Sequence, residues 1–136
     1  MKVNKKTKIK SISKKSVEKI VNILSDFCVR ELGVNKRRKE DLVFYLKKRD
    51  KVEKKVFGYY DMDDHEIYIM TGVCKKLNDF IRTFIHEYTH SLQPCKTQYN
   101  KLLAKFGYDE HPFELEAYSN EKKYFKLALK EIKDRL

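Results

Sequence analysis

Two histidines four residues apart, with a glutamate directly after the first, constrain this chain more than any other feature. The run His86-Glu87-Tyr88-Thr89-His90 places both imidazoles on one face of a helix, one turn apart. Zinc prefers compact nitrogen and oxygen ligands in a tetrahedron, and two histidines on a stiff helix supply two of them with little conformational entropy left to lose. We therefore expect a zinc site at His86 and His90, with Glu87 beside a metal-bound water.

The sequence around this motif predicts a helix. Apolar residues recur every three or four positions over residues 73–92, and His86 and His90 lie off that apolar stripe. The pattern alone also fits a surface helix whose solvent face carries two histidines, and chance would produce the motif in about one chain of this length in a hundred. The surface-helix interpretation does not account for the carboxylate-rich helix that follows.

Composition indicates one packed domain. The 136 residues are 41% hydrophobic and 12% aromatic, which supports a single core although 38% of the residues are charged. The sequence has neither an apolar run long enough to span a bilayer nor the apolar segment of a signal peptide. We expect a soluble cytoplasmic protein, in the host cytoplasm if the chain is viral, with no membrane partner. Its three cysteines are far apart and predict reduced thiols, although Cys95 follows the metal helix closely enough to reach the zinc.

Periodicity and turn residues predict an α+β fold. Residues 1–13 are expected to form a disordered basic tail, and residues 14–136 a single domain. The expected elements are a helix over 17–32 ended by Gly33, a strand over 41–48, a hairpin of strands over 56–60 and 66–70, a helix over 97–106 closed by Gly107, and a last helix after Pro112. The small sheet, mixed or antiparallel, should pack on the metal helix and on the C-terminal helix.

The hairpin precedes the metal helix directly. Its second strand, with Ile67, Tyr68 and Ile69, is a candidate edge strand that would accept an extended peptide by main-chain pairing. The hairpin is equally compatible with a purely structural role.

The last helix offers candidates for a third metal ligand. Glu114 falls near the middle of its apolar face and Glu121 lies two turns further on. A buried carboxylate needs a partner, and a metal ion would remove the cost of burying it. Glu116 lies at the edge of the same arc, with Asn120 one turn below to hydrogen-bond a histidine. Both glutamates remain candidates, with Glu114 favoured.

The combination of His86-Glu87-x-x-His90 with Glu114-Leu115-Glu116-Ala117 resembles the gluzincins, zinc peptidases whose third ligand is a glutamate on a downstream helix. In CAAX-processing membrane peptidases and anti-repressor regulatory peptidases that glutamate stands three residues before an alanine, which would select Glu114. In thermolysin-like enzymes it directly precedes a small residue and stands four before an aspartate, which would select Glu116 with Asn120 in place of the aspartate. The resemblance covers residues 56–121 and extends to the element order of minimal single-domain gluzincins, including phage and viral ones.

The resemblance implies a zincin-like metallopeptidase domain with one zinc ion per chain. It would be a metalloendopeptidase that hydrolyses a peptide or protein substrate with zinc-activated water, and Glu87 would be the general base. His111, Tyr108 or Tyr118 would stabilise the oxyanion. His111 precedes Pro112 and is equally well placed to cap the last helix.

The formal net charge of +11 leaves other classes open. Lysines crowd the first fifteen residues, and a basic N-terminus attracts nucleic acid or an acidic protein partner. One alternative is a basic DNA-associated protease of the SprT-like kind, although such proteins use a third histidine where this chain offers glutamates. The other is a non-enzymatic module that binds nucleic acid or protein.

Overall fold

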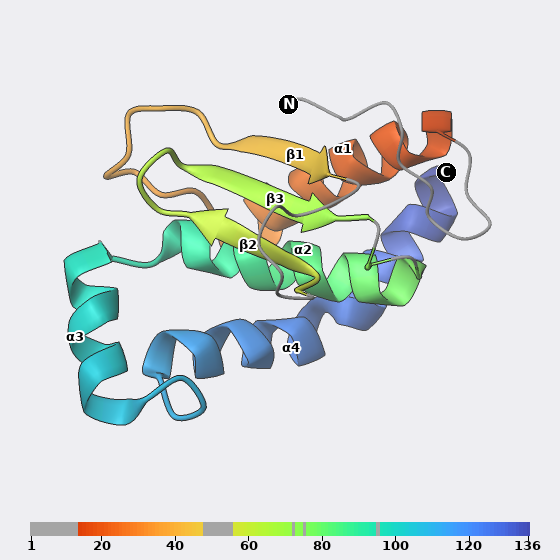
Figure 1. Ribbon diagram of the computed structural model, residues 1–136. Helices are drawn as coiled ribbons and strands as arrows, with labels where there is room; N and C mark the ends of the chain where they lie inside the picture. The colour runs from red at the N-terminus through yellow and green to blue at the C-terminus, as the bar shows by residue number, and fades with distance from the viewer. Residues whose placement is uncertain (1–13, 48–55, 72, 75, 95) are drawn as a thin grey trace.

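The computed structural model describes residues 14–47, 56–71, 73–74, 76–94 and 96–136 (Figure 1). Its elements, in chain order, are α1 (Lys14–Leu32), β1 (Val43–Lys47), β2 (Gly58–Asp61), β3 (Glu66–Met70), α2 (Leu77–Leu92), α3 (Lys96–Phe106) and α4 (Pro112–Arg135). The α+β prediction is confirmed, with element ends within a few residues of those expected from the sequence. The expected disordered tail of residues 1–13 and the alternative ligand Cys95 lie outside the described residues.

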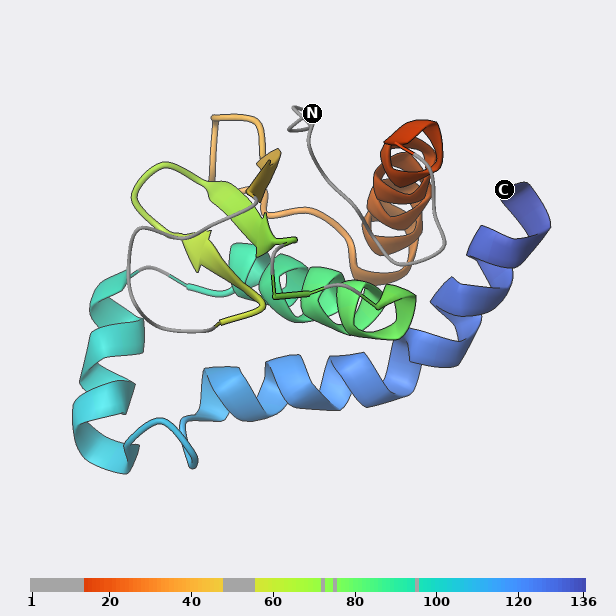
Figure 2. The ribbon, with the colours of Figure 1, turned by 45° about the vertical axis from the view of Figure 1, so that its right-hand side comes forward.

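Helix α2 is the centre of the molecule. The sheet packs on one side of it and α4 on the other, while α1 contacts both helices (Figures 1 and 2). The face of α2 that bears His86 is therefore covered, and the side chains of Thr83, Glu87 and Thr89 are buried as well. The simple surface-helix interpretation of the motif is wrong, because α4 shields the polar face of α2 from solvent.

The three strands form a mixed sheet in the order β1-β3-β2. Strand β3 pairs with β1 in parallel and with β2 in antiparallel register. The expectation that Ile67, Tyr68 and Ile69 form an edge strand is wrong, because β3 is the middle strand and both of its edges are paired. Among the described residues, the strand with a free edge beside α2 is β2.

Side chains alternate across the sheet as a two-residue period requires. Ile67 and Ile69 point into the core with Phe44, whose ring stacks on that of Phe84 of α2 with 4.5 Å between the centroids. On the other face Tyr68 stacks between the tyrosines of the two neighbouring strands. The sheet is thus bound to α2 through one apolar face.

Local signals account for the ends of several elements. Gly33 adopts a positive φ of 85° and closes α1, as its position predicted. In the hairpin turn, Oδ1 of Asp61 accepts hydrogen bonds from the backbone of Asp63 and Asp64, so the acidic run forms the turn expected of it. Within the described parts of the chain, no helix combines the length and the apolar character needed to cross a membrane.

Candidate metal centre

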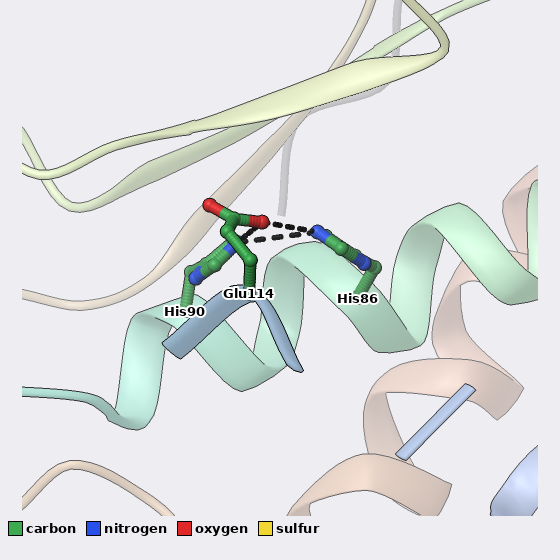
Figure 3. A group of neighbouring side chains, drawn as sticks. All are labelled: His86, His90 and Glu114. Atoms are coloured by element: carbon green, nitrogen blue, oxygen red, sulfur yellow. Dashed lines mark hydrogen bonds and ion pairs between the residues drawn. The ribbon is translucent and has the colours of Figure 1, made fainter. Parts of the chain in front are cut away.

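Three side chains from two helices meet between α2 and α4 (Figure 3). The Nε2 atoms of His86 and His90 lie 3.2 Å apart on α2. Oε1 of Glu114, in the first turn of α4, lies 3.0 Å from each of them. All three residues are largely or fully buried. The spacing of the two histidines is a property of the helix, whereas Glu114 joins them only because α4 packs against α2.

His111 determines where α4 begins. Its Nδ1 accepts a hydrogen bond from the backbone N–H of Phe113, and Pro112 occupies the first turn, where a missing N–H costs nothing. The other ring nitrogen, Nε2, donates to the backbone carbonyl of Tyr99. Both nitrogens of His111 are therefore engaged with backbone, and the side chain is fully buried. The structure does not bring His111 to the site as an oxyanion stabiliser, because it is the cap of α4.

Hydrogen bonds on the far side of each imidazole determine its tautomer. Nδ1 of His86 lies 2.6 Å from a carboxylate oxygen of Glu121, which when ionised can only accept a hydrogen bond. Nδ1 of His90 lies 2.6 Å from Oε1 of Gln93. The amide of Gln93 is oriented because its Nε2 donates to a carboxylate oxygen of Glu116, so Oε1 must accept. Each neutral imidazole consequently carries its proton on Nδ1 and turns a bare Nε2 toward the other.

This arrangement calls for a cation. When both imidazoles are neutral, two unprotonated Nε2 atoms and one carboxylate oxygen, within 3.2 Å of one another, direct three lone pairs into the same space. Ligands at about 2.1 Å from a tetrahedral zinc lie about 3.4 Å apart, close to the spacing seen here. Hydrogen bonds from the Nδ1 atoms to Glu121 and Gln93 are the outer contacts that metal-binding histidines usually make. His86, His90 and Glu114 therefore fit a zinc ion, with room for a fourth ligand from the cleft.

When no metal is bound, protons on the imidazole nitrogens supply the positive charge next to Glu114. Burial lowers the pKa of His86, but hydrogen bonds with Glu114 and Glu121 outweigh burial and raise it to about 10. Burial likewise raises the pKa of Glu114, but hydrogen bonds with His86 and His90 reverse the effect and hold it well below its usual range. The site thus favours positive charge on its nitrogens opposite an ionised carboxylate, and a bound metal would compete with those protons.

Glu87 is buried beside the three ligand candidates but does not join them. Its carboxylate makes no hydrogen bond within the described part of the chain, and only 8% of the residue is exposed. It faces the two cavities that flank the metal centre. Burial raises the pKa of Glu87, although the nearby imidazoles of His86 and His90 oppose the shift. A carboxylate in this position is available to a water molecule in the cleft.

A cleft runs between β2 and α4. Its central cavity, of about 270 Å³, lies over the metal centre. A second cavity, of about 250 Å³, continues past Glu121 toward the start of β2. The lining residues most relevant to binding are in β2, namely Gly58, Tyr59 and Tyr60. Strand β2 thus forms one wall of the cleft, opposite the three ligand candidates.

Tyrosines line the other wall. The hydroxyl of Tyr99 donates a 2.6 Å hydrogen bond to Oε2 of Glu114, which leaves Oε1 to face the histidines. Tyr108 lines both cavities, and its hydroxyl lies 3.2 Å from that of Tyr118. Burial, followed by that contact, raises the pKa of Tyr108, so its hydroxyl stays protonated.

The remaining site candidates do not contact the three ligand candidates directly. Glu116 is exposed and reaches Gln93 rather than a histidine. Asn120 donates to the hydroxyl of Thr89, so the prediction that it would bond a histidine is wrong. Sequence reasoning missed Gln93 and Tyr99. Gln93 stands three residues after His90, a helical spacing that could have been noticed, but nothing in the sequence indicates Tyr99.

Comparisons with known proteins add no evidence about this site. No family model, no curated protein and no solved structure matches the chain. The expected resemblance to gluzincins therefore rests on the motif residues of the sequence alone.

Proposed function

We propose that this protein is a zinc-dependent metalloendopeptidase of the gluzincin kind. The observation that carries the proposal is the convergence of two imidazole Nε2 atoms and one carboxylate oxygen within 3.2 Å, inside a cleft and beside a glutamate whose carboxylate has no hydrogen-bond partner among the described residues. His86, His90 and Glu114 would hold one zinc ion. When bound, zinc would polarise the scissile carbonyl and lower the pKa of its water toward about 7.

Glu87 would move the proton. Its carboxylate has no hydrogen-bond partner among the described residues and faces both cavities, so it can accept a proton from the attacking water and return it to the leaving amine. Burial raises the pKa of this carboxyl, which makes its carboxylate form a stronger base toward a water molecule. Glu87 itself would not bind the metal.

Strand β2 would bind the substrate. Within the described sheet β2 is an edge strand that lines the cleft, and an extended peptide can add to such a strand through main-chain hydrogen bonds that make little demand on sequence. Antiparallel pairing, the slightly more stable arrangement, would run the peptide from the Met62 end of β2 toward the Gly58 end. This role replaces the one that the sequence assigned to Ile67, Tyr68 and Ile69.

Tyr108 would stabilise the oxyanion. It lines both cavities and its hydroxyl is a protonated donor, whereas the hydroxyl of Tyr99 is engaged by Glu114. The contact with Tyr118 can hold the ring of Tyr108 in position. A donor aimed at the developing negative charge is a large contributor to amide hydrolysis.

The SprT-like alternative would require a third histidine at the metal. The two histidines outside the motif are engaged elsewhere, because His65 lies in the hairpin turn and His111 caps α4. The chain offers Glu114 instead.

Metal content tests the proposal first. Zinc is measured by plasma mass spectrometry on wild-type protein and on His90→Ala, Glu114→Ala, Glu116→Ala and Glu87→Gln, purified without chelator and supplied with zinc. We expect about one zinc per chain, lost in His90→Ala and Glu114→Ala and retained in the other two. A wild-type protein that binds no zinc would refute the metal site.

Hydrolysis is tested on the same proteins with a library of internally quenched peptides. Zinc-loaded wild type should cleave, and Glu87→Gln should hold zinc while losing cleavage, because the carboxylate is needed for the proton and not for the metal. If Glu87→Gln cleaves as fast as wild type, Glu87 is not the general base. A protein that binds zinc and cleaves no peptide would contradict the peptidase activity while leaving the metal site intact.

A further inference from the structure

The cleft continues beyond the metal centre into a basic cavity. This cavity, of about 360 Å³, adjoins the central one and shares four lining residues with it, Tyr60, Met62, Gln93 and Pro94. Its other walls come from the segment after α1 and from the start of α3, with Asn35, Arg37, Arg38 and Lys96. Three cations and no carboxylate therefore line its described walls.

Two of the three cations already have acidic partners. Arg38 forms an ion pair with Glu40 and donates to the backbone carbonyl of Met62. Lys96 lies 3.1 Å from a carboxylate oxygen of Asp63, and both of these side chains are more than half exposed. The contacts of Arg38 fix this wall of the cavity against the hairpin turn.

Arg37 is the cation of this cavity for which the described residues provide no acidic partner. Its guanidinium makes no hydrogen bond or ion pair with the described residues, whereas its backbone N–H is held by the side chain of Asn35 at 3.0 Å. Asn35 in turn donates to the backbone carbonyl of Ser91 in α2. A chain of hydrogen bonds thus connects the backbone at Arg37 to the metal helix, while the guanidinium remains available to a ligand.

Helix α3 adds to the positive potential. It begins at Lys96, and its first turn contains no acidic residue. The positive end of its dipole at this cavity is therefore not neutralised by its own side chains. A guanidinium, an ammonium and a helix N-terminus together favour a carboxylate over a neutral or basic group.

We propose that this cavity binds an acidic side chain of the peptide substrate, and that Arg37 selects it. The inference rests on the proposed peptidase function, because β2 leads from the metal centre to the basic cavity. A peptide antiparallel to β2 would place its amino-terminal residues at Met62 and Arg37. The selected residue is therefore an aspartate or glutamate on the amino-terminal side of the cleaved bond.

Peptide binding tests this proposal without requiring catalysis. Zinc-loaded Glu87→Gln protein is titrated with fluorescent hexapeptides of alanine and glycine that carry a single glutamate or, in the matched peptide, a single glutamine. The position of that residue is scanned along the peptide, and binding is followed by anisotropy. We expect about a tenfold preference for glutamate over glutamine at one or two positions, because a hydrogen bond between two charged groups is worth about that factor.

Substitutions of Arg37 give the decisive comparison. Arg37→Gln in the same background should abolish the preference, and Arg37→Lys should retain most of it. Lys36→Gln is the matched control, because it removes the same charge from an exposed neighbour that does not line the cavity, and it should leave the preference unchanged. Equal binding of the glutamate and glutamine peptides, or a preference that survives Arg37→Gln, would overturn the proposal. The proposal would also be overturned if an oligonucleotide displaced the acidic peptide from the wild-type cavity and Arg37→Gln abolished the binding of that oligonucleotide.

Cleavage sites independently show on which side of the cleaved bond the acidic residue lies. Wild-type protein is incubated with a proteome-derived peptide library, and the residues around each cut are identified by mass spectrometry. Aspartate and glutamate should be enriched on the amino-terminal side of the cut in wild type and in Lys36→Gln but not in Arg37→Gln. Enrichment on the carboxyl-terminal side would contradict the placement. Binding preference without any cleavage would support the acidic subsite and refute the peptidase, so the two failures are distinguishable.

Discussion

The carboxylate of Glu121 lies 2.6 Å from Nδ1 of His86, two turns of α4 beyond Glu114. One helix therefore supplies both a ligand candidate for the metal and the acceptor that orients one of the histidines. Because Glu121 holds the proton of His86 on Nδ1, the bare Nε2 is directed at the site. The packing of α4 on α2 thus determines the geometry of the candidate metal centre through two residues, Glu114 and Glu121.

Removal of Glu121 should weaken zinc binding without abolishing it. Glu121→Ala leaves the three ligand candidates intact but frees the ring of His86, and loss of such an outer contact typically costs tenfold to about a hundredfold in metal affinity. Competition with a chelating dye measures the change. Asp134→Asn is the control, since it removes one negative charge from the exposed end of α4 and should leave affinity unaltered. Unchanged affinity in Glu121→Ala would show that this contact does not position His86.

Tyr108→Phe should lower turnover while leaving zinc in place. If its hydroxyl stabilises the oxyanion, its loss should reduce kcat about a hundredfold with little change in KM, because the contact is made mainly in the transition state. Steady-state kinetics with a quenched peptide, together with zinc content, provide the measurement. Tyr118→Phe should have a smaller effect, because Tyr118 acts through Tyr108. An increase in KM alone would indicate a role in substrate binding instead.

Gly58 should not tolerate a side chain. A Cβ at this position would lie 2.6 Å from the backbone oxygen of Tyr68 and 2.8 Å from Cγ2 of Thr83, so β2 would have to move away from both β3 and α2. We expect Gly58→Ala to lower the free energy of unfolding by about 1–3 kcal/mol, as overpacking typically does. Urea denaturation measures it.

A second substitution tests the cause of that loss. Thr83→Ser removes the methyl group that the new Cβ would meet, so it should recover part of the loss in the Gly58→Ala background while destabilising the wild type slightly. The contact with Tyr68 is a backbone contact and would remain. Strictly additive effects of the two substitutions would contradict the steric account.

His65 should make the protein less stable in acid. Burial, and then the charge of Arg38, lower the pKa of His65 below its usual value of 6.5. Below pH 6.5 the unfolded chain consequently binds more protons at this residue than the folded chain does. The contribution of His65 to stability is therefore retained above that pH and lost as the pH falls toward the lowered pKa.

His65→Asn isolates this effect. Asparagine tolerates the positive φ of 56° found at this position and does not titrate. The drop in Tm between about pH 7.5 and about pH 5 should be smaller in the variant than in wild type. Both proteins are melted in chelator, so that the metal site contributes equally. An identical drop in both would show that His65 titrates normally in the folded protein.

Local sequence signals predicted most of the fold. Apolar periodicity located α1 and α2, and Gly33 predicted the end of α1 because only a residue without Cβ adopts a positive φ easily. The acidic turn between β2 and β3 predicted their hairpin. These features depend on neighbours within a few residues of one another, which is why the sequence reveals them.

Local sequence signals could not predict the order of the strands in the sheet. The hairpin is local, but the parallel pairing of β1 with β3 joins segments more than twenty residues apart. That pairing places β3 in the middle and leaves β1 and β2 as the edge strands of the described sheet, with β2 the one beside the cleft. The role expected for Ile67, Tyr68 and Ile69 was wrong for this reason.

By itself the sequence determined the spacing of His86, Glu87 and His90, because one helical turn fixes the relative directions of side chains four residues apart. It also placed Glu114 and Glu116 two residues apart on the last helix and left both as candidates for the third ligand. Only the tertiary structure decided that Glu114 meets the histidines while Glu116 reaches Gln93, because the choice depends on how α4 is rotated against α2. That rotation is set by the packing of two helices over their whole length, and no local pattern in the sequence specifies it.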